Sequence, residues 1–212
     1  MSRSRPDRDT QSRERRRLLM RIALEHFAEK GYHATKISDI VGEAGVAQGT
    51  FYWHFKSKEA AALEIIEEGR NELLAVIAQG YRRDAGTVQD MVRASEALLY
   101  RLFRFAEENR PLMRLLLGGM AASEAVHRAI GETRVAMENA FLNNIRRAIE
   151  LGMLPETIDA RMKAALLMSL IEGVIARWLF GGELPGNGIE GKTAGQLAAE
   201  TARFEFFGLL GI

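Results

Sequence analysis

The sequence predicts an all-α protein of about nine helices, in which a small three-helix domain at the N-terminus precedes a larger helical domain. Apolar residues recur at helical spacing along most of the 212-residue chain, and no long stretch keeps the two-residue alternation of a surface strand. Glycine or proline stands where several of these periodic stretches end. With 47% apolar residues and only four prolines, the chain can bury sizeable cores.

The chain begins with a polar segment that leads into the first helix. Residues 1–12 are too polar to pack, so we expect a flexible basic arm there. Leu19, Ile22 and Phe27 then share one face of a helix that ends at Gly31. This helix would lie across the next two and complete a three-helix core.

A second, short helix follows. Ile37, Ile40 and Val41 lie on one of its faces. Thr35 stands just before it, where a hydroxyl can accept a hydrogen bond from a free backbone N–H. Gly45 comes at its end. Helices often end at a residue in the left-handed backbone conformation, which glycine adopts without steric cost.

The third helix carries the polar groups that point to a function. Phe51 and Phe55, four residues apart, can both face inward, which leaves Gln48, Thr50 and Tyr52 to point elsewhere. These three side chains offer hydrogen-bonding groups of different reach, as base edges require. Two short helices joined by a tight turn, with almost no acid on the presented surface, have the layout of a helix-turn-helix that docks in the DNA major groove.

A fourth helix starts with an unusual charge. Ser57 is a good N-cap, and Glu59 suits the first turn. Lys58 at this end opposes the helix macrodipole by roughly 0.3–1 kcal/mol. A bound phosphate would reverse that sign, because the lysine and the free N–H groups would both favour the anion. The alternative is an ordinary solvated lysine.

Charge is distributed unevenly along the chain. Residues 1–58 carry 12 Lys and Arg against 7 Asp and Glu, whereas residues 59–212 carry 17 against 21. The basic end is therefore the one with the helix-turn-helix pattern. Arg13 and Arg15 to Arg17 either reach the minor groove and flanking phosphates or only solubilise the chain. The apolar runs are too short to span a membrane and no secretory h-region is present, so we expect a cytoplasmic protein without membrane contact.

Sequence features of enzymes and metal sites are missing. The chain has no cysteine, which excludes disulfides, thiolate metal ligation and thiol-based redox sensing. Its four histidines lie far apart, and there is no Gly-rich phosphate loop, HExxH motif or nucleophile elbow. His26, on the apolar side of the first helix, fits a core residue better than a ligand. We therefore expect no enzyme activity, no metal and no cofactor.

The segment from Arg13 to Leu63 resembles the DNA-binding domain of the TetR family of bacterial transcriptional regulators. The matching pieces are ISDIV, AGVAQGTFYWHF and KSKEA. The resemblance implies a DNA-binding domain over residues 13–59 and an effector-binding and dimerisation domain over residues 60–212. It also implies a homodimer on a double-stranded operator of two-fold symmetry.

Positions in this segment acquire expected roles from the resemblance. It implies phosphate contacts by Thr35, Tyr52, His54 and Lys58, base contacts by Gln48 and Thr50, and further DNA-facing positions at Lys36, Ala47 and Gly49. Ala47 departs from the Ser or Thr common in the family, which removes a cap and a phosphate contact. Lys36 replaces what is often a second threonine and adds a charge. Gly49 would permit close approach of backbone to DNA.

The remainder reads as helices with short breaks at Gly86, Pro111, Gly152 and Pro155. The last two expected helices have broader apolar faces than one neighbour would cover. Paired with their copies in a second subunit, they would form a four-helix bundle with an isologous interface. The expected helices span about residues 60–77, 88–108, 111–118, 123–151, 156–180 and 192–210. The expected dimer interface comprises Leu166, Leu170, Gly173, Trp178, Leu197, Phe204 and Phe207.

A ligand pocket is predicted from adaptable apolar residues on the central helices. Methionine fits irregular shapes and is common at permissive binding surfaces, although apolar side chains at helical spacing are more often plain core. Arg104, His127, Arg134, Asn139 and Glu172 could orient a ligand, or be solvated or paired. The expected lining is Met91, Phe103, Met113, Met120, Met137, Phe141 and Met168.

Together these features predict a dimeric regulator, a repressor by resemblance alone, that a small and mostly apolar effector releases from a palindromic operator. The alternative is a DNA-binding protein whose C-terminal domain binds another protein. A flat exposed apolar patch in place of an enclosed cavity would favour that alternative.

Overall fold

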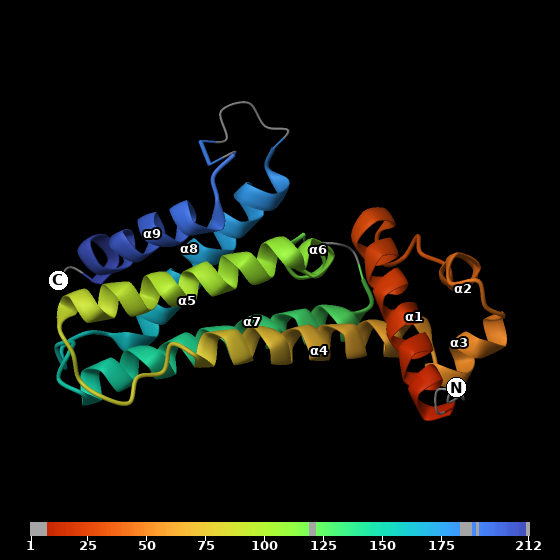
Figure 1. The fold of residues 1–212 in the computed structure, drawn as a ribbon, viewed down its shortest axis with the longest axis horizontal. Helices are drawn as coiled ribbons and strands as arrows, with labels where there is room; N and C mark the ends of the chain where they lie inside the picture. The colour runs from red at the N-terminus through yellow and green to blue at the C-terminus, as the bar shows by residue number, and fades with distance from the viewer. Residues whose placement is uncertain (1–7, 119–121, 183–187, 190, 211–212) are drawn as a thin grey trace, which may run out of the picture.

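The computed structural model describes residues 8–118, 122–182, 188–189 and 191–210, and within them all regular secondary structure is helical (Figure 1). The predicted all-α fold is confirmed. The N-terminal helices are α1 Arg8–Lys30, α2 Ile37–Glu43, α3 Gln48–His54 and α4 Lys58–Ala78. They are followed by α5 Val88–Glu108, α6 Arg110–Leu117, α7 Glu124–Glu150, α8 Ala160–Phe180, α9 Ala194–Phe204 and the π-helical segment η1 Glu205–Leu210.

The molecule is elongated, with α1, α2 and α3 gathered at one end (Figure 1). Helix α4 leaves this group and runs beside α7, while α5 runs beside α9. Helix α6 packs against α1, so it joins the helical domain to the three-helix end. No helix in the described residues is long and apolar enough to cross a membrane.

The three-helix end is held by a compact apolar core. Phe27, Phe51 and Ile40 are completely buried, and Phe55 is nearly so. Gly45 adopts φ +65°, the left-handed conformation expected at the end of α2. The predicted helix-turn-helix therefore forms from the residues that its apolar pattern indicated.

Close contact between α4 and α6 depends on a glycine. A Cβ built on Gly69 would lie 2.6 Å from Cδ2 of Leu112, a separation that no packed pair of carbons tolerates. Gly69 lies inside α4, where glycine costs about 1 kcal/mol relative to alanine. The close packing of α6 on α4 explains why that cost is tolerated.

Several helix limits differ from the expected ones. Helix α1 already begins at Arg8, so residues 8–12 are helical, while residues 1–7 of the expected arm lie outside the described residues. Helix α8 begins at Ala160 instead of near 156, because Asp159 caps it by accepting from the Met162 N–H at 3.0 Å. The last expected helix divides into α9 and the π-helical η1.

Candidate nucleic-acid interface and effector cavities

The outward face of α3 carries the residues expected to contact bases. Gln48 and Gly49 are exposed, Tyr52 is exposed over half of its surface, and Thr50 is half-buried. Phe51 on the opposite face is completely buried, which sets the rotation of the helix. A Cβ on Gly49 would meet nothing within 4 Å in the free protein, so the glycine leaves open space there.

Trp53 is an exposed residue that the sequence reasoning did not single out. It is 71% exposed, the most of any large hydrophobic side chain in the described part of the chain. Its ring packs edge-on against His54, with ring centroids 4.5 Å apart. The signal was available in the sequence, because inward-facing Phe51 and Phe55 leave position 53 pointing outward.

An open groove separates the N-terminal half of α1 from α3. It is lined by Gln11, Ser12, Arg15, Gly49, Thr50, Trp53 and His54. Burial lowers the pKa of His54, and the positive charges of Arg16 and Arg15 lower it further. The groove thus holds the Arg15 guanidinium and the His54 imidazole, while Arg16 lies outside the lining and pairs with Glu64. Such a surface attracts an anion such as a phosphate.

Lys58 has a structural role that the sequence did not indicate. Its ammonium group donates to the carbonyl oxygens of Tyr32 at 2.6 Å and Thr35 at 2.8 Å. It also lies 4.5 Å from the centre of the Tyr32 ring. Partial burial lowers the pKa of Lys58. In the free protein this lysine ties the start of α4 to the turn between α1 and α2.

Three other positions expected to lie at the DNA surface flank the starts of α2 and α3. The expectation that Thr35 caps α2 was wrong: its hydroxyl is buried and donates to the carbonyl of Gly31 at 2.8 Å. Lys36 is instead the N-cap residue of α2, is exposed, and makes no side-chain cap hydrogen bond. Ala47 is the exposed N-cap residue of α3 and likewise supplies no side-chain cap. Thr35 therefore anchors the turn, because its hydroxyl is satisfied inside the fold.

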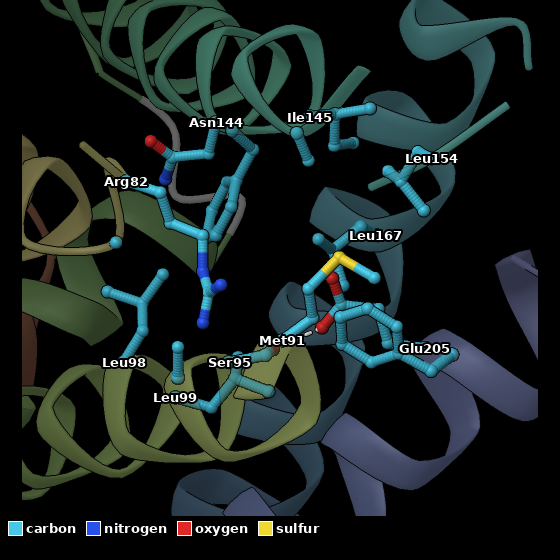
Figure 2. Close-up of a pocket in the computed structure, with 15 residues that line it drawn as sticks. Arg82, Met91, Ser95, Leu98, Leu99, Asn144, Ile145, Leu154, Leu167 and Glu205 are labelled. Carbon is cyan, nitrogen blue, oxygen red and sulfur yellow. Dashed lines mark hydrogen bonds between the residues drawn. The ribbon is translucent and has the colours of Figure 1, made fainter. Parts of the chain in front are cut away.

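The predicted pocket residues divide between two cavities of the helical domain. The distal cavity, of about 70 Å³, lies between α5, α7, α8 and η1 and includes Met91 and Phe141 (Figure 2). The proximal cavity, of about 20 Å³, lies between α4, α6, α7 and α8 and includes Met113, Met137 and Met168. The sequence could not separate these groups, because every one of these residues lies on an apolar helix face.

Two members of the predicted lining belong to neither cavity. Phe103 is completely buried and packs edge-on against Trp178, with ring centroids 6.2 Å apart, so it is core. Met120 lies outside the described residues.

Among the polar candidates, Arg134 and Glu172 come together. The Arg134 Nε donates to Glu172 at 2.6 Å across α7 and α8, and both residues line the proximal cavity. This carboxylate raises the pKa of Arg134. Arg104 instead pairs with Glu107 and Glu108 on its own helix, while His127 and Asn139 are exposed and line neither cavity.

Four large apolar side chains on α8 and its C-terminal neighbours are open to solvent. Met162 is 55% exposed, Leu166 45%, Phe204 55% and Phe207 62%. Leu170 is half-buried and Gly173 is exposed. We name Met162, Leu166, Phe204 and Phe207 the α8–α9 apolar face.

Leu197 does not belong to that face. It is only 6% exposed within the subunit, in which α9 packs against α5. Its expected place in the dimer interface was therefore wrong. The half-buried Trp178 is occupied within the subunit as well, since its Nε1 donates to the Lys192 carbonyl at 2.8 Å.

Comparison with known proteins finds relatives of this fold and surface. Residues 19–65 match the family model described as "Bacterial regulatory proteins, tetR family". An uncharacterised HTH-type transcriptional regulator of Bacillus subtilis, YdgC, is 25% identical over 197 residues, which cover 93% of each chain. Residues 19–65 therefore form a DNA-binding domain of the TetR family. The chain is a transcriptional regulator of the helix-turn-helix class.

Two further comparisons differ in how much of the chain they cover. The transcriptional repressor KstR2 of Mycolicibacterium smegmatis is 40% identical, but over 63 residues that cover 30% of this chain and 31% of that one. The structure of FadR from Bacillus subtilis in complex with stearoyl-CoA covers 92% of this chain and 98% of that chain, with a TM-score of 0.72 and 20% identity. At that identity the second comparison shows the fold alone.

Proposed function

We propose that the protein is a homodimeric repressor that binds a palindromic operator and dissociates when a small, mostly apolar effector enters its helical domain. The observation that carries this proposal is the α8–α9 apolar face. A monomer that exposed two phenylalanines, a leucine and a methionine in one region would be at risk of aggregation. A second copy of the chain is the simplest cover, because helices from two subunits can close a four-helix bundle.

The DNA surface supports the operator part of the proposal. Dimerisation through α8 and α9 leaves α3 of each subunit free at the far end of the molecule (Figure 1). Two such helices can occupy successive major-groove segments about 34–36 Å apart. We assign base contacts to Gln48 and Thr50. Phosphate contacts are assigned to Tyr52, His54 and the Lys58 end of α4, with Lys36, Ala47 and Gly49 close to the backbone.

Helix α6 supplies a physical connection between effector and DNA. It packs against α1 on one side and against α4 and α8 on the other. Its residues Met113 and Leu116 line the proximal cavity, so a ligand that enlarges that cavity would displace α6. The displaced α6 would in turn move α1 and the recognition helices. To shift operator occupancy from 99:1 to 1:99, the effector must prefer the released state by about 10⁴-fold.

The oligomeric state is tested with Phe204→Asp, which places a charge on the α8–α9 apolar face. Val135→Asp is the matched control, because Val135 is 60% exposed on α7 and lies outside that face. Sedimentation should give dimers for the natural chain and Val135→Asp, and monomers for Phe204→Asp. A dimer that survives Phe204→Asp would place the interface elsewhere.

The operator is tested by selecting bound sequences from a random pool of duplexes. We expect a two-fold-symmetric consensus that the natural chain binds and the monomeric Phe204→Asp variant binds weakly. Transcription from a promoter that contains this consensus should fall when the protein is added, whereas a rise would identify an activator. A C-terminal domain that binds another protein would leave operator affinity unaffected by every small molecule.

A further inference from the structure

The distal cavity contains a buried carboxyl group. Glu205, the first residue of η1, lines the cavity and is only 7% exposed. The Ser95 hydroxyl on α5 donates a hydrogen bond to its Oε2 (Figure 2). A buried carboxylate is costly without a cation or several hydrogen-bond donors nearby. The burial of Glu205 therefore requires an explanation.

The walls around Glu205 are almost entirely apolar. Leu98, Leu99, Phe141, Leu167 and Phe206 surround the space from α5, α7, α8 and η1. They can cover a hydrocarbon body but offer the carboxyl group no hydrogen bond.

Arg82, between α4 and α5, is the other charged residue of the described lining. Its guanidinium donates to the Asp90 carbonyl at 2.5 Å and approaches the sulfur of Met153 at 3.7 Å, so it is bonded at the α4–α5 end of the cavity. On neighbouring turns, Arg93 and Glu96 of α5 are exposed. Lys163 of α8 lies one turn before Leu167 and makes an interaction of its own.

We propose that the distal cavity binds a small lipophilic cation, a primary ammonium on a short hydrocarbon body, with the ammonium paired to the Glu205 carboxylate. An anionic head group would face the carboxyl group, while Arg82 is already bonded elsewhere. A neutral ligand would gain a hydrogen bond from the acid but no charge pairing. This inference names the ligand class of the proposed effector domain and rests on the proposed function to that extent.

The size of the cavity limits the ligand. A dry apolar cavity of about 150 Å³ is known to hold benzene. The distal cavity, at about 70 Å³, is smaller, so its ligand is slender or widens the space on entry. A linear six-carbon chain with a terminal head group is a slender probe of this kind.

Binding of a cation at this site releases a proton. Burial raises the pKa of Glu205 to about 7, and the Ser95 hydrogen bond opposes that rise. The acid is therefore mostly neutral at pH 6 and mostly ionised at pH 8. An ammonium ligand, charged at both values, pairs with the carboxylate and sends the carboxyl proton to the buffer. Its affinity should rise about tenfold between pH 6 and pH 8 and level off above that.

The test uses the full chain and three probes with one chain length: hexylammonium, hexan-1-ol and hexanoate. Calorimetric titration should give the tightest binding for hexylammonium, with the tenfold pH effect and a proton release that depends on buffer ionisation enthalpy. Glu205→Gln should abolish the preference and the pH effect while hexan-1-ol still binds. Glu96→Gln, an exposed glutamate on α5, is the matched control and should behave like the natural chain.

Ser95→Ala provides a second variant if Glu205→Gln folds poorly. Loss of the hydroxyl donor should raise the pKa of Glu205 further, so the pH at which hexylammonium binding reaches half its maximum should move upward. Preferential binding of hexanoate would identify an anion site at Arg82 and overturn the inference. Equal binding of all three probes, or binding of none, would overturn it as well.

Operator release is measured separately with labelled duplex. Hexylammonium that binds through Glu205 without releasing DNA would contradict the proposed effector role and leave the cation site standing. Release of DNA by hexylammonium that persists unchanged in Glu205→Gln would support the effector role and overturn the cation site.

Discussion

The helix-turn-helix and the distal cavity differ in how the chain brings their functional side chains together. The DNA surface is built from one run of sequence, in which Phe51 and Phe55 face the core and every residue between them is thereby oriented. The cavity is assembled from separate segments, since Arg82, Ser95, Asn144 and Glu205 are up to 123 positions apart in the chain. A local sequence pattern can therefore predict the DNA surface, whereas the distal cavity forms only when the helices pack together.

The largest contrast should come from the core of the DNA-binding end. Phe51→Ala removes a completely buried ring and should cost about 3–5 kcal/mol. Operator binding should be lost, while the helical domain keeps its cavities and still binds a ligand. The free energy of unfolding and ligand binding are measured for this variant beside Tyr52→Phe, which keeps the exposed ring. Loss of both activities together would mean that the two regions fold as one cooperative unit.

The next contrast concerns the cavity and depends on pH. The folded protein raises the pKa of Glu205 to about 7, so the neutral acid favours the folded state below the unfolded pKa and this contribution is lost as pH rises through 7. Glu205→Gln should therefore be more stable than the natural chain at pH 8, by about 3 kcal/mol at most, and close to it near pH 4. Urea unfolding at the two pH values measures the difference. A constant difference would show that Glu205 does not titrate as described.

A smaller effect is expected from the exposed face of α3. Gln48→Ala should cost about 1–3 kcal/mol on the selected operator and relax preference at one or two base positions. Binding constants on single-base operator variants provide the measurement. Equal loss on every variant would assign Gln48 to backbone contacts.

The smallest effect should come from Lys58. Removing one phosphate contact with Lys58→Ala should weaken binding to all sequences alike and lower the salt slope by about one. Because Lys58 also donates to the Tyr32 and Thr35 carbonyls, the variant should lose some stability too. Lys36→Ala, an exposed neighbour without those bonds, should change DNA binding without this loss of stability. If the salt dependence of DNA affinity were unchanged in Lys58→Ala, the role of Lys58 would be purely structural.

Particular residues show how far pattern reasoning reached. Helix α5 runs from Val88 to Glu108, as its apolar spacing and the Gly86 break indicated. Thr35 was placed on the surface by its position before α2, but its hydroxyl points inward and donates to the carbonyls of His26 and Gly31. Leu197 was assigned to the dimer because it shares a helical stripe with Phe204, but it is buried within the subunit, in which α9 packs against α5. In both cases a neighbour from elsewhere in the chain changed what the residue contacts.

Sequence alone was enough for the helical class, the polar face of α3 and the basic character of the DNA-binding end, because each follows from spacing within a few turns of helix. Tertiary packing alone decided which methionines line which cavity, that Glu205 is buried beside Ser95, and which apolar side chains stay uncovered on α8 and α9. The reason is physical: helical periodicity defines a face, but burial and the pKa of an acid depend on whatever other segment lies against that face.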